Sequence, residues 1–196
     1  DGNIDGEENG DGLMQFGEKY FSDLEIGEAG STDAFMRPSN VWTLDNEEIG
    51  TYAKTPDATY TEKVESGEIY SDLGLAKEAT YDVYTDGVQV DGEEFTLSKG
   101  EEDAKIGGNG VQVEVYKDAK TIIVINTYVG EVSAVEEATS KKDAYVVIDP
   151  KSGSVNDDEF ETEDFEEGDI VLYTYSNKRG EDCIQSMAAT ETVVGE

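Results

Sequence analysis

The strongest constraint on the fold is a pair of short runs at residues 111–128 that follow the two-residue period of β-strands. Residues 111–116, VQVEVY, alternate strictly between apolar and polar side chains. Residues 121–128 return as a run rich in β-branched residues, and the polar residues 117–120 between the two runs suit a turn. This pattern predicts a β-hairpin whose second run is a central strand.

Turn signals predict further hairpins on both sides of this one. Asp86-Gly87 separates residues 81–84 from residues 88–90, and Asp91-Gly92 precedes residues 94–97. Asp-Gly between alternating apolar residues is typical of a two-residue hairpin turn. We expect further strands at residues 41–44 and 49–53 around Asp45-Asn46, at 145–148 before Asp149-Pro150, and at 170–175 after Gly168-Asp169.

Helix signals are few, so the sequence predicts an all-β fold with minor helix. Residues 13–24 place apolar side chains at a spacing that suits one helical face, but Gly17 weakens that pattern, and helix and strand both stay open. Residues 59–66 suit one short helical turn. The phrase TYVGE at residues 127–131 returns as TVVGE at residues 192–196, which indicates tandem β units.

We therefore expect two small antiparallel β domains in series. Residues 1–12 are acidic and rich in glycine, with a single apolar residue, and are predicted to be a linker. Residues 13–128 would form an N-terminal β domain. Residues 129–196 would form a small barrel of the OB or SH3 kind. Because the chain begins at Asp1, we expect it to be a piece of a longer protein.

The net charge of −33, from 47 acids and 14 Lys and Arg, limits the partners that the chain can have. Nucleic acids and anionic lipid headgroups both require a basic patch, and 14 scattered cations do not supply one. No stretch approaches the roughly 20 apolar residues of a membrane span. We expect no nucleic acid partner and no membrane insertion, and only nonspecific association with divalent cations.

The absence of histidine removes most catalytic chemistry. A Ser-His-Asp or Cys-His arrangement is impossible, and no serine is followed by Lys at the third position. The single Cys183 has no histidine to activate it, and a structural thiol near a strand end is expected. A glycosidase that uses a pair of acids remains open only because composition does not exclude it. We predict that the chain is not an enzyme.

Calcium is the one metal that this composition suits, because it takes oxygen ligands alone. The opening residues match the first part of an EF-hand or dockerin-type loop, with candidate ligands Asp1, Asn3, Asp5, Glu7 and Asn9. The twelfth position, where a bidentate Glu belongs, is Gly12. We predict no cofactor and at most weak calcium binding. The acidic run at residues 157–167 is expected to be a solvated strand and loop anchored by Phe160 and Phe165.

Aromatic side chains provide the alternative of glycan binding, since exposed rings stack on sugars. Trp42 is the candidate ligand-binding residue. Strand aromatics are also typical of cores and of cross-strand pairs. Further candidates of the same kind are Tyr52, Tyr60, Tyr70, Tyr81 and Tyr84.

Five phrases along the chain are distinctive: FGEKYFSDL at 16–24, IGTYAKTPDATY at 49–60, EIYSDLGL at 68–75, TYVGEV at 127–132 and KKDAYVVIDP at 141–150. Together they resemble the middle region of large S-layer-homology-domain-containing surface proteins of gut Firmicutes. The resemblance implies an extracellular segment of a Gram-positive cell wall or S-layer. The residues at 21–24 resemble the opening of the wall-anchoring module, but its helical remainder does not follow, so other parts of the parent protein would supply anchoring and any contact with wall or surface glycans.

Together these features predict a non-enzymatic structural or display segment of a secreted bacterial cell-surface protein, with a glycan- or host-ligand-binding β module as the alternative. Surface β domains of Gram-positive bacteria also use Lys-Asn or Lys-Asp cross-links in place of disulfides. No pairing can be chosen from this sequence, and we expect the intact mass to show no loss of ammonia or water.

Overall fold

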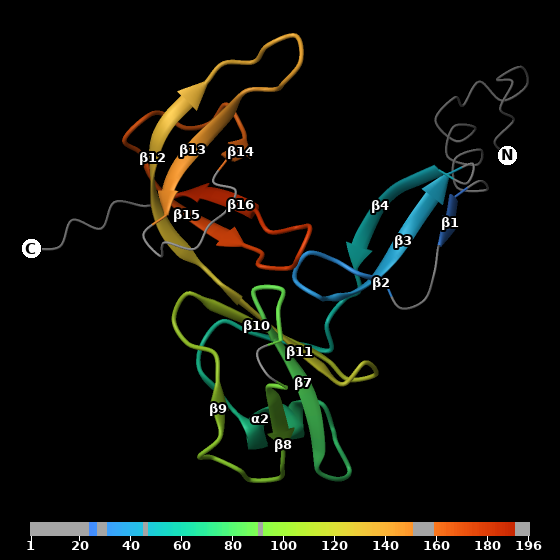
Figure 1. Cartoon of the computed structure of the whole chain (residues 1–196). Coiled ribbons are helices and arrows are strands. Elements are labelled where there is room, and N and C mark those ends of the chain that lie inside the picture. The colour runs from blue at the N-terminus through green and yellow to red at the C-terminus, as the bar shows by residue number, and fades with distance from the viewer. Residues whose placement is uncertain (1–23, 27–30, 45–46, 90–91, 151–158, 191–196) are drawn as a thin grey trace, which may run out of the picture. The chain divides into compact units, whose positions relative to one another are not determined.

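The structure is a computed structural model that describes residues 24–26, 31–44, 47–89, 92–150 and 159–190. Within these ranges the chain is mostly β-structure, with several antiparallel sheets and one helix (Figure 1). The predicted all-β fold with minor helix is therefore confirmed. The chain divides into two compact units, residues 1–33 with 37–55, and residues 34–36 with 56–196.

The first unit is an antiparallel sheet built around β3 (Pro38–Leu44). β4 (Glu47–Ala53) pairs along one edge of β3, and the other edge is shared by β1 (Leu24–Ile26) and β2 (Ser31–Thr32). β3 and β4 are the hairpin expected around Asp45-Asn46. The Asp33 carboxylate accepts both the main-chain N–H of Arg37, at 2.9 Å, and its guanidinium Nε, at 2.6 Å. This pair closes the turn between β2 and β3.

The second unit begins with a five-stranded sheet that we call the helix-backed sheet. β10 and β11 form the predicted hairpin, and β11 also pairs in parallel with β7, which in turn pairs antiparallel with β8. The strand order is β5 (Ala58–Tyr60), β10 (Val111–Tyr116), β11 (Thr121–Asn126), β7 (Ala79–Thr85) and β8 (Glu94–Leu97). β6 (Val64–Glu65) and β9 (Lys105–Ile106) form a separate two-stranded ladder.

The helix α2 (Ser66–Asp72) begins with two small residues, Ser66 and Gly67, which lie close to the backbone of neighbouring segments. A Cβ on Gly67 would lie 2.8 Å from the backbone nitrogen of Glu101, so only glycine fits this approach. The buried Ser66 hydroxyl donates to the Thr96 carbonyl at 2.8 Å and accepts the Ser98 N–H at 2.9 Å. The helical turn predicted at residues 59–66 is wrong. This segment contains the last residues of β5, which pairs with β10, and all of β6, which pairs with β9. The helix starts only at Ser66, where its first turn contacts the loop after β8.

The core of the helix-backed sheet lies between α2 and the strands. Ile69 and Leu73 of the helix pack against strand residues that are almost completely buried, which include Tyr81, Leu97, Val113 and Ile122. The opposite face of β11 presents Ile123 and Ile125 to Phe35 and Tyr116. β11 is thus buried on both faces, and its predicted role as a central strand is confirmed.

The second sheet of this unit is antiparallel and nearly closed. β14 lies beside β16 without pairing with it, so the five strands form a barrel-like sheet, and the predicted small β-barrel is confirmed. The order is β14 (Glu159–Glu161), β13 (Tyr145–Pro150), β12 (Tyr128–Glu136), β15 (Ile170–Tyr175) and β16 (Ile184–Ala189).

The barrel core explains why the acidic run at residues 157–167 folds back. Phe160 and Phe165 pack against the buried cluster of the barrel, which includes Val146, Ile148 and Tyr173, whereas the charged residues beside them are exposed. The expectation of a solvated strand and loop held by two aromatic anchors is confirmed for the described part of the run. The predicted boundary at residues 128–129 coincides with the start of β12, and the domain boundaries stay predictions. The predicted linker at residues 1–12 lies outside the described residues.

Candidate functional site

Asp86 is a buried carboxylate in a chain whose acids are mostly exposed. Its exposed fraction is 3%, and its φ of 48° lies in the left-handed region that favours Asn, Asp and Gly. It occupies the tight turn after β7, where Thr85 and Val88 form a bridge. The Asp86-Gly87 turn was predicted, and the structure adds that the turn residue is buried. The strand predicted at residues 88–90 is wrong for its described residues, because only the isolated bridge of Val88 to Thr85 forms there and β7 pairs with β8 instead.

The Asp86 carboxylate is held by donors that lie at the junction of β11 and β12. Its Oδ1 accepts the main-chain N–H of Asn126 at 2.9 Å. Its Oδ2 accepts the Asn126 side-chain amide at 2.9 Å and the Tyr128 hydroxyl at 2.5 Å. Asn126 ends the helix-backed sheet and Tyr128 begins the barrel, so one side chain is bonded to both sheets.

The backbone of Asp86 extends the same connection to the β15–β16 loop. Its N–H donates to the Val124 carbonyl at 2.9 Å, and its carbonyl accepts the N–H of Asn177 at 2.7 Å. A buried carboxylate that accepts from three donors, in a residue whose peptide N–H and carbonyl are also paired, is well satisfied. This arrangement orders the turn and leaves little capacity for a ligand.

Gly87 is required for the approach of two other segments. Its φ is +85°, and a Cβ would lie 2.4 Å from the Ala34 carbonyl oxygen and 2.8 Å from Ser176 Oγ. The buried Ser176 hydroxyl donates to that same carbonyl at 2.6 Å. We use the name Asp86 junction for Asp86, Gly87, Asn126, Tyr128, Ser176 and Asn177.

Tyr128 remains a neutral hydrogen-bond donor within the Asp86 junction. Burial raises the pKa of its phenol, and the hydrogen bond and charge of Asp86 raise it further. Its ring lies against Tyr173 with the two ring centroids 5.6 Å apart. The hydroxyl therefore binds Asp86 while the ring packs in the barrel.

Among the described residues, another buried carboxylate accepts hydrogen bonds from two neutral side chains. Glu114 of β10 is 4% exposed, and it accepts the Gln112 amide at 2.6 Å and the Tyr116 hydroxyl at 2.8 Å. Neutral donors such as these satisfy a buried carboxylate without providing a nucleophile or an acid-base partner. The arrangement at both sites is typical of structural hydrogen bonding.

The predicted metal ligands lie outside the described residues, and the predicted ligand-binding residue lies within them. Asp1, Asn3, Asp5, Glu7 and Asn9 lie outside the described residues, so the calcium prediction is untested. Trp42 lies half-buried on β3, opposite Gly50 of β4. The ring of Tyr52, which is 57% exposed, lies against Gly50, where a Cβ would come within 2.9 Å of it. Trp42 and Tyr52 thus share one face of the first unit.

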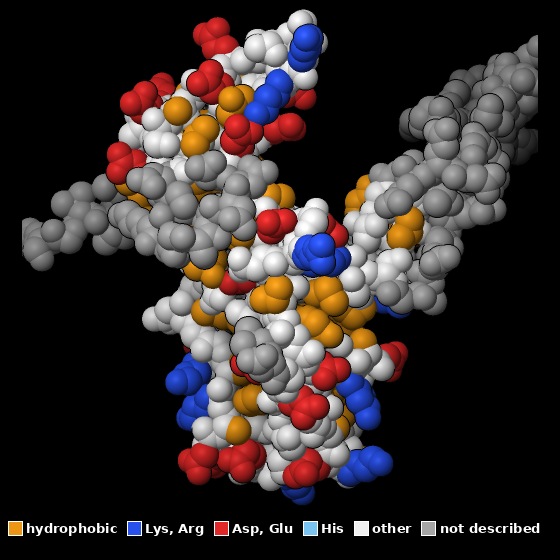
Figure 2. All heavy atoms as spheres, in the orientation of Figure 1, with side chains coloured by type: hydrophobic (Ala, Val, Ile, Leu, Met, Phe, Trp, Pro, Cys, Tyr) orange, Lys and Arg blue, Asp and Glu red, His pale blue; other side chains and the backbone are white. Residues whose placement is uncertain are grey.

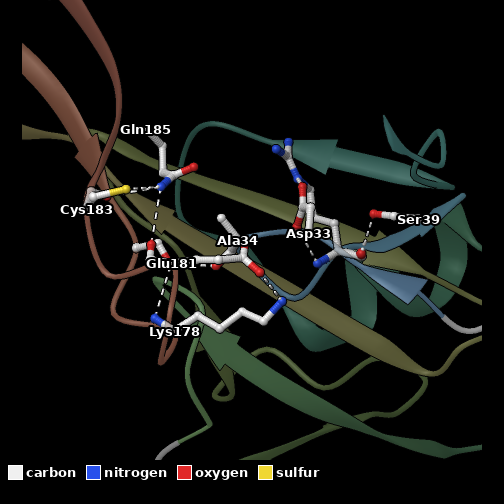
Figure 3. Close-up of polar contacts among 9 residues, drawn as sticks. Asp33, Ala34, Ser39, Lys178, Glu181, Cys183 and Gln185 are labelled. Atoms are coloured by element: carbon white, nitrogen blue, oxygen red, sulfur yellow. Dashed lines mark hydrogen bonds and ion pairs between the residues drawn. The ribbon is translucent and has the colours of Figure 1, made fainter. Parts of the chain in front are cut away.

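Cys183 lies in the loop just before β16, as the sequence predicts for a structural thiol. Its Sγ accepts the Gln185 side-chain amide at 3.1 Å, and the same amide donates to the Cys183 carbonyl at 3.1 Å (Figure 3). Nearby, Lys178 and Glu181 form an ion pair at 2.9 Å. These contacts order the loop that carries Ser176 and Asn177.

Acidic side chains are spread widely over the visible surface, and Lys and Arg side chains lie among them in smaller groups (Figure 2). One exposed ion pair joins Lys105 of β9 to Glu65 of β6, and another joins Lys142 of the β12–β13 loop to Glu159 of β14. The partner carboxylate raises the pKa of each lysine. No group of three potential metal ligands occurs among the residues that the structure describes.

Sequence reasoning identified the turn at Asp86 but not its partners. The signal was present, because an Asp-Gly turn ahead of the Asn-Thr-Tyr at residues 126–128 offers an acceptor and two donors. Nothing in the spacing brings these residues together, since they are 40 positions apart and meet only through the parallel pairing of β7 with β11.

Comparison with known proteins gives no match, whether to family models, to curated proteins or to solved structures. In the described part of the chain, no helix has the length and apolar character needed to cross a membrane.

Proposed function

We propose that this chain is a non-enzymatic structural or display segment of a secreted bacterial cell-surface protein. The resemblance to S-layer-associated surface proteins and the acidic, cysteine-poor, strand-rich composition support this proposal. A segment of this kind needs a fold that transmits position from one part to the next, and it needs no reactive centre.

The Asp86 junction is the observation that carries the proposal. The helix-backed sheet and the barrel are joined by one residue, Thr127, which links β11 to β12. Two sheets joined in this way would ordinarily be free to bend at that residue. The carboxylate of Asp86 bonds to both sides of the link, at Asn126 and Tyr128, and its carbonyl holds the β15–β16 loop. Four such bonds stiffen the link, which suits a spacer.

The acidic surface suits the same role. Repulsion among carboxylates is screened beyond about 8 Å at physiological ionic strength, and divalent cations reduce it further. A surface at −33 would hold a hydrated, cation-rich layer and resist nonspecific association with other acidic surfaces.

Native-state hydrogen exchange tests the mechanical part of this proposal. We expect the slowest amides of β11 and β12 to exchange with the same free energy of opening, because one junction couples the two sheets. Independent opening of the barrel at a much lower free energy would show a flexible link and overturn the spacer.

An antibody against the purified chain should also label intact cells that produce it, and exclusive labelling of broken cells would contradict a surface location.

A glycan-binding module is the second candidate, and the face shared by Trp42 and Tyr52 favours it. An exposed ring lying against a glycine beside a tryptophan provides a flat surface on which a sugar can stack. A glycan array with the intact chain tests this function, followed by Trp42→Ala and Tyr52→Ala. Lys54→Ala is the control, because it removes an exposed side chain from the same unit. Specific binding that only the aromatic substitutions abolish would replace the spacer as the main function.

A further inference from the structure

Three of the 14 cations of this chain line a single hollow of the helix-backed sheet. The hollow has a volume of about 670 Å³ and lies where the α2–β7 connection meets the turn between β10 and β11. Lys77 comes from the connection, and Lys117 and Lys120 come from the turn. In a protein with 47 acids, such a concentration of lysines needs a physical reason.

Hydrogen bonds hold the β10–β11 turn, which carries two of these lysines, to the neighbouring segments. The main-chain N–H of Lys117 donates to the Asp57 carboxylate at 2.7 Å, and the Lys117 ammonium donates to the Leu73 carbonyl at the end of α2 at 2.8 Å. The Lys120 carbonyl accepts the N–H of Asp82 at 3.0 Å. The hollow is therefore preformed, because both of its walls are tied to the sheet and the helix.

Tyr81 lines this hollow, and its side chain is buried. Its exposed fraction is 1%, yet no hydrogen bond to its hydroxyl occurs among the described residues. Buried hydroxyls are nearly always paired in proteins, so this group has capacity for a ligand. Burial and then the charges of Asp57 and Asp118 raise its pKa, which keeps the phenol protonated as a donor.

The charges around the hollow favour one class of ligand. Among the lining residues, three lysines stand against Glu78 and Asp118, which leaves one net positive charge on the lining itself, and Asp57 lies just beside it. A ligand with a single negative charge balances this net charge. A dianion such as phosphate exceeds it and is repelled by the two carboxylates. These carboxylates can accept hydrogen bonds from the hydroxyl groups of a sugar. The volume lies within the range of small-molecule sites, about 300–1,000 Å³.

We propose that this hollow binds a carboxylate-bearing sugar, a uronate, free or at the end of an acidic glycan. The lysine ammonium groups bind the sugar carboxylate, the Tyr81 hydroxyl donates to a ring or hydroxyl oxygen, and Glu78 and Asp118 accept from the sugar hydroxyls. This site is separate from the Asp86 junction and from the Trp42 face, so its test does not depend on the proposed function.

Titration of the ¹⁵N-labelled chain with glucuronate and with a digalacturonate, followed by amide chemical shifts at physiological salt, tests the proposal. We expect saturable shifts centred on residues 75–81 and 117–120, with the singly charged glucuronate binding at least as tightly as the doubly charged disaccharide. Glucose and inorganic phosphate, used as separate probes, should bind at least tenfold more weakly. Equal binding of glucose, or tighter binding of phosphate than of uronate, would overturn the assignment.

Matched variants separate the roles of the lining residues. Lys77→Gln combined with Lys120→Gln should weaken glucuronate binding about tenfold or more, while Lys99→Gln, an exposed lysine outside the hollow, should leave it unchanged. Tyr81→Phe should weaken it about fivefold and leave the melting temperature unchanged or higher, because the ring is kept and only an unpaired hydroxyl is lost. No saturable binding by the intact chain, or equal loss in Lys99→Gln, would refute the site.

Discussion

At the scale of single residues, position and not residue type decides what an acid does in this chain. Asp86 and Asp118 both sit in turns of the helix-backed sheet, yet Asp86 is buried among three donors while Asp118 is exposed beside a hollow. Burial converts a carboxylate from a soluble surface group into a bond between segments, provided that every lone pair finds a donor.

Replacement of Asp86 should destabilise the second unit strongly. Asp86→Ala leaves the Asn126 amide and the Tyr128 hydroxyl without their acceptor and places alanine at positive φ, so we expect a loss of about 3–5 kcal/mol. Asp86→Asn tolerates that φ and should lose about 1–3 kcal/mol. Urea unfolding measures both. Asp143→Ala, at an exposed acid, should change stability by less than about 0.5 kcal/mol, and an equal loss there would contradict the assigned role of Asp86.

Replacement of Gly87 separates backbone strain from steric exclusion. Gly87→Ala must place a Cβ within 2.4 Å of the Ala34 carbonyl oxygen, and we expect a loss of about 3 kcal/mol or more in the free energy of unfolding. Gly92→Ala is the matched control, because its φ is also positive but nothing lies within 4 Å of the added Cβ. It should lose only about 1 kcal/mol. Similar losses at the two positions would mean that the close approach is unimportant.

At the scale of elements, short strands depend on the side chains that they deliver to the core. β14 has three residues and pairs only with β13, so its three backbone pairs alone do not hold it. Its middle residue, Phe160, packs into the barrel core and fixes which face of the strand points inward.

Truncation of Phe160 should therefore open one edge of the barrel. Phe160→Ala is expected to cost about 1–3 kcal/mol, less than for a fully buried phenylalanine, because the side chain is half-buried. Hydrogen exchange should speed up at residues 145–147 of β13, which pair with β14. Glu161→Ala, on the solvent side of the same strand, should leave both quantities almost unchanged. Protection that survives in Phe160→Ala would show that another contact holds β14.

At the scale of the whole molecule, titration and screening act on many groups together. Within the part of the chain that the structure describes, burial is the chief cause of a raised pKa at Tyr60, Tyr81 and Tyr128. Lys105 and Lys142 have a raised pKa because of their carboxylate partners. Each group binds its proton more tightly in the folded chain than in the unfolded chain.

Stability should therefore fall as the pH rises above the ordinary tyrosine pKa of 10.0. In that range the unfolded chain loses phenolic protons that the folded chain retains, so unfolding releases protons and alkali favours it. Urea unfolding at a series of pH values from about 8 to 11 measures the effect. Tyr128→Phe removes one of these groups and should make the decline shallower. A free energy of unfolding that does not change across this range would contradict the raised pKa values.

Divalent cations should stabilise the chain weakly and without selectivity. Millimolar Ca²⁺ and Mg²⁺ are both expected to raise the melting temperature by a few degrees, because each reduces repulsion among 47 acids. Calorimetry with each ion measures this. A saturable micromolar site selective for Ca²⁺ would contradict it, and loss of that site in Asp1→Ala or Asp5→Ala would locate it at the predicted loop.

The sequence determined the main hairpins, because alternation and turn chemistry are local. The hairpin of β10 and β11 follows from the alternation at residues 111–116 and the β-branched run after it, and the tight turn at Asp86-Gly87 follows from its residue types. The barrel-like closure of the last strands was also predictable, since many short strands with regular turns can bury a core in few other ways.

Only the tertiary structure decided which distant residues meet. The parallel pairing of β7 with β11 has no local signal, and it alone places Asp86 beside Asn126 and Tyr128. The start of α2 depends in the same way on a contact of Gly67 with Glu101. Lys77 is distant in the sequence from Lys117 and Lys120, and folding brings it to the turn that carries them, so that all three line one hollow. Hydrogen bonds and charges act over a few ångströms of space, and distance along the sequence does not specify that separation.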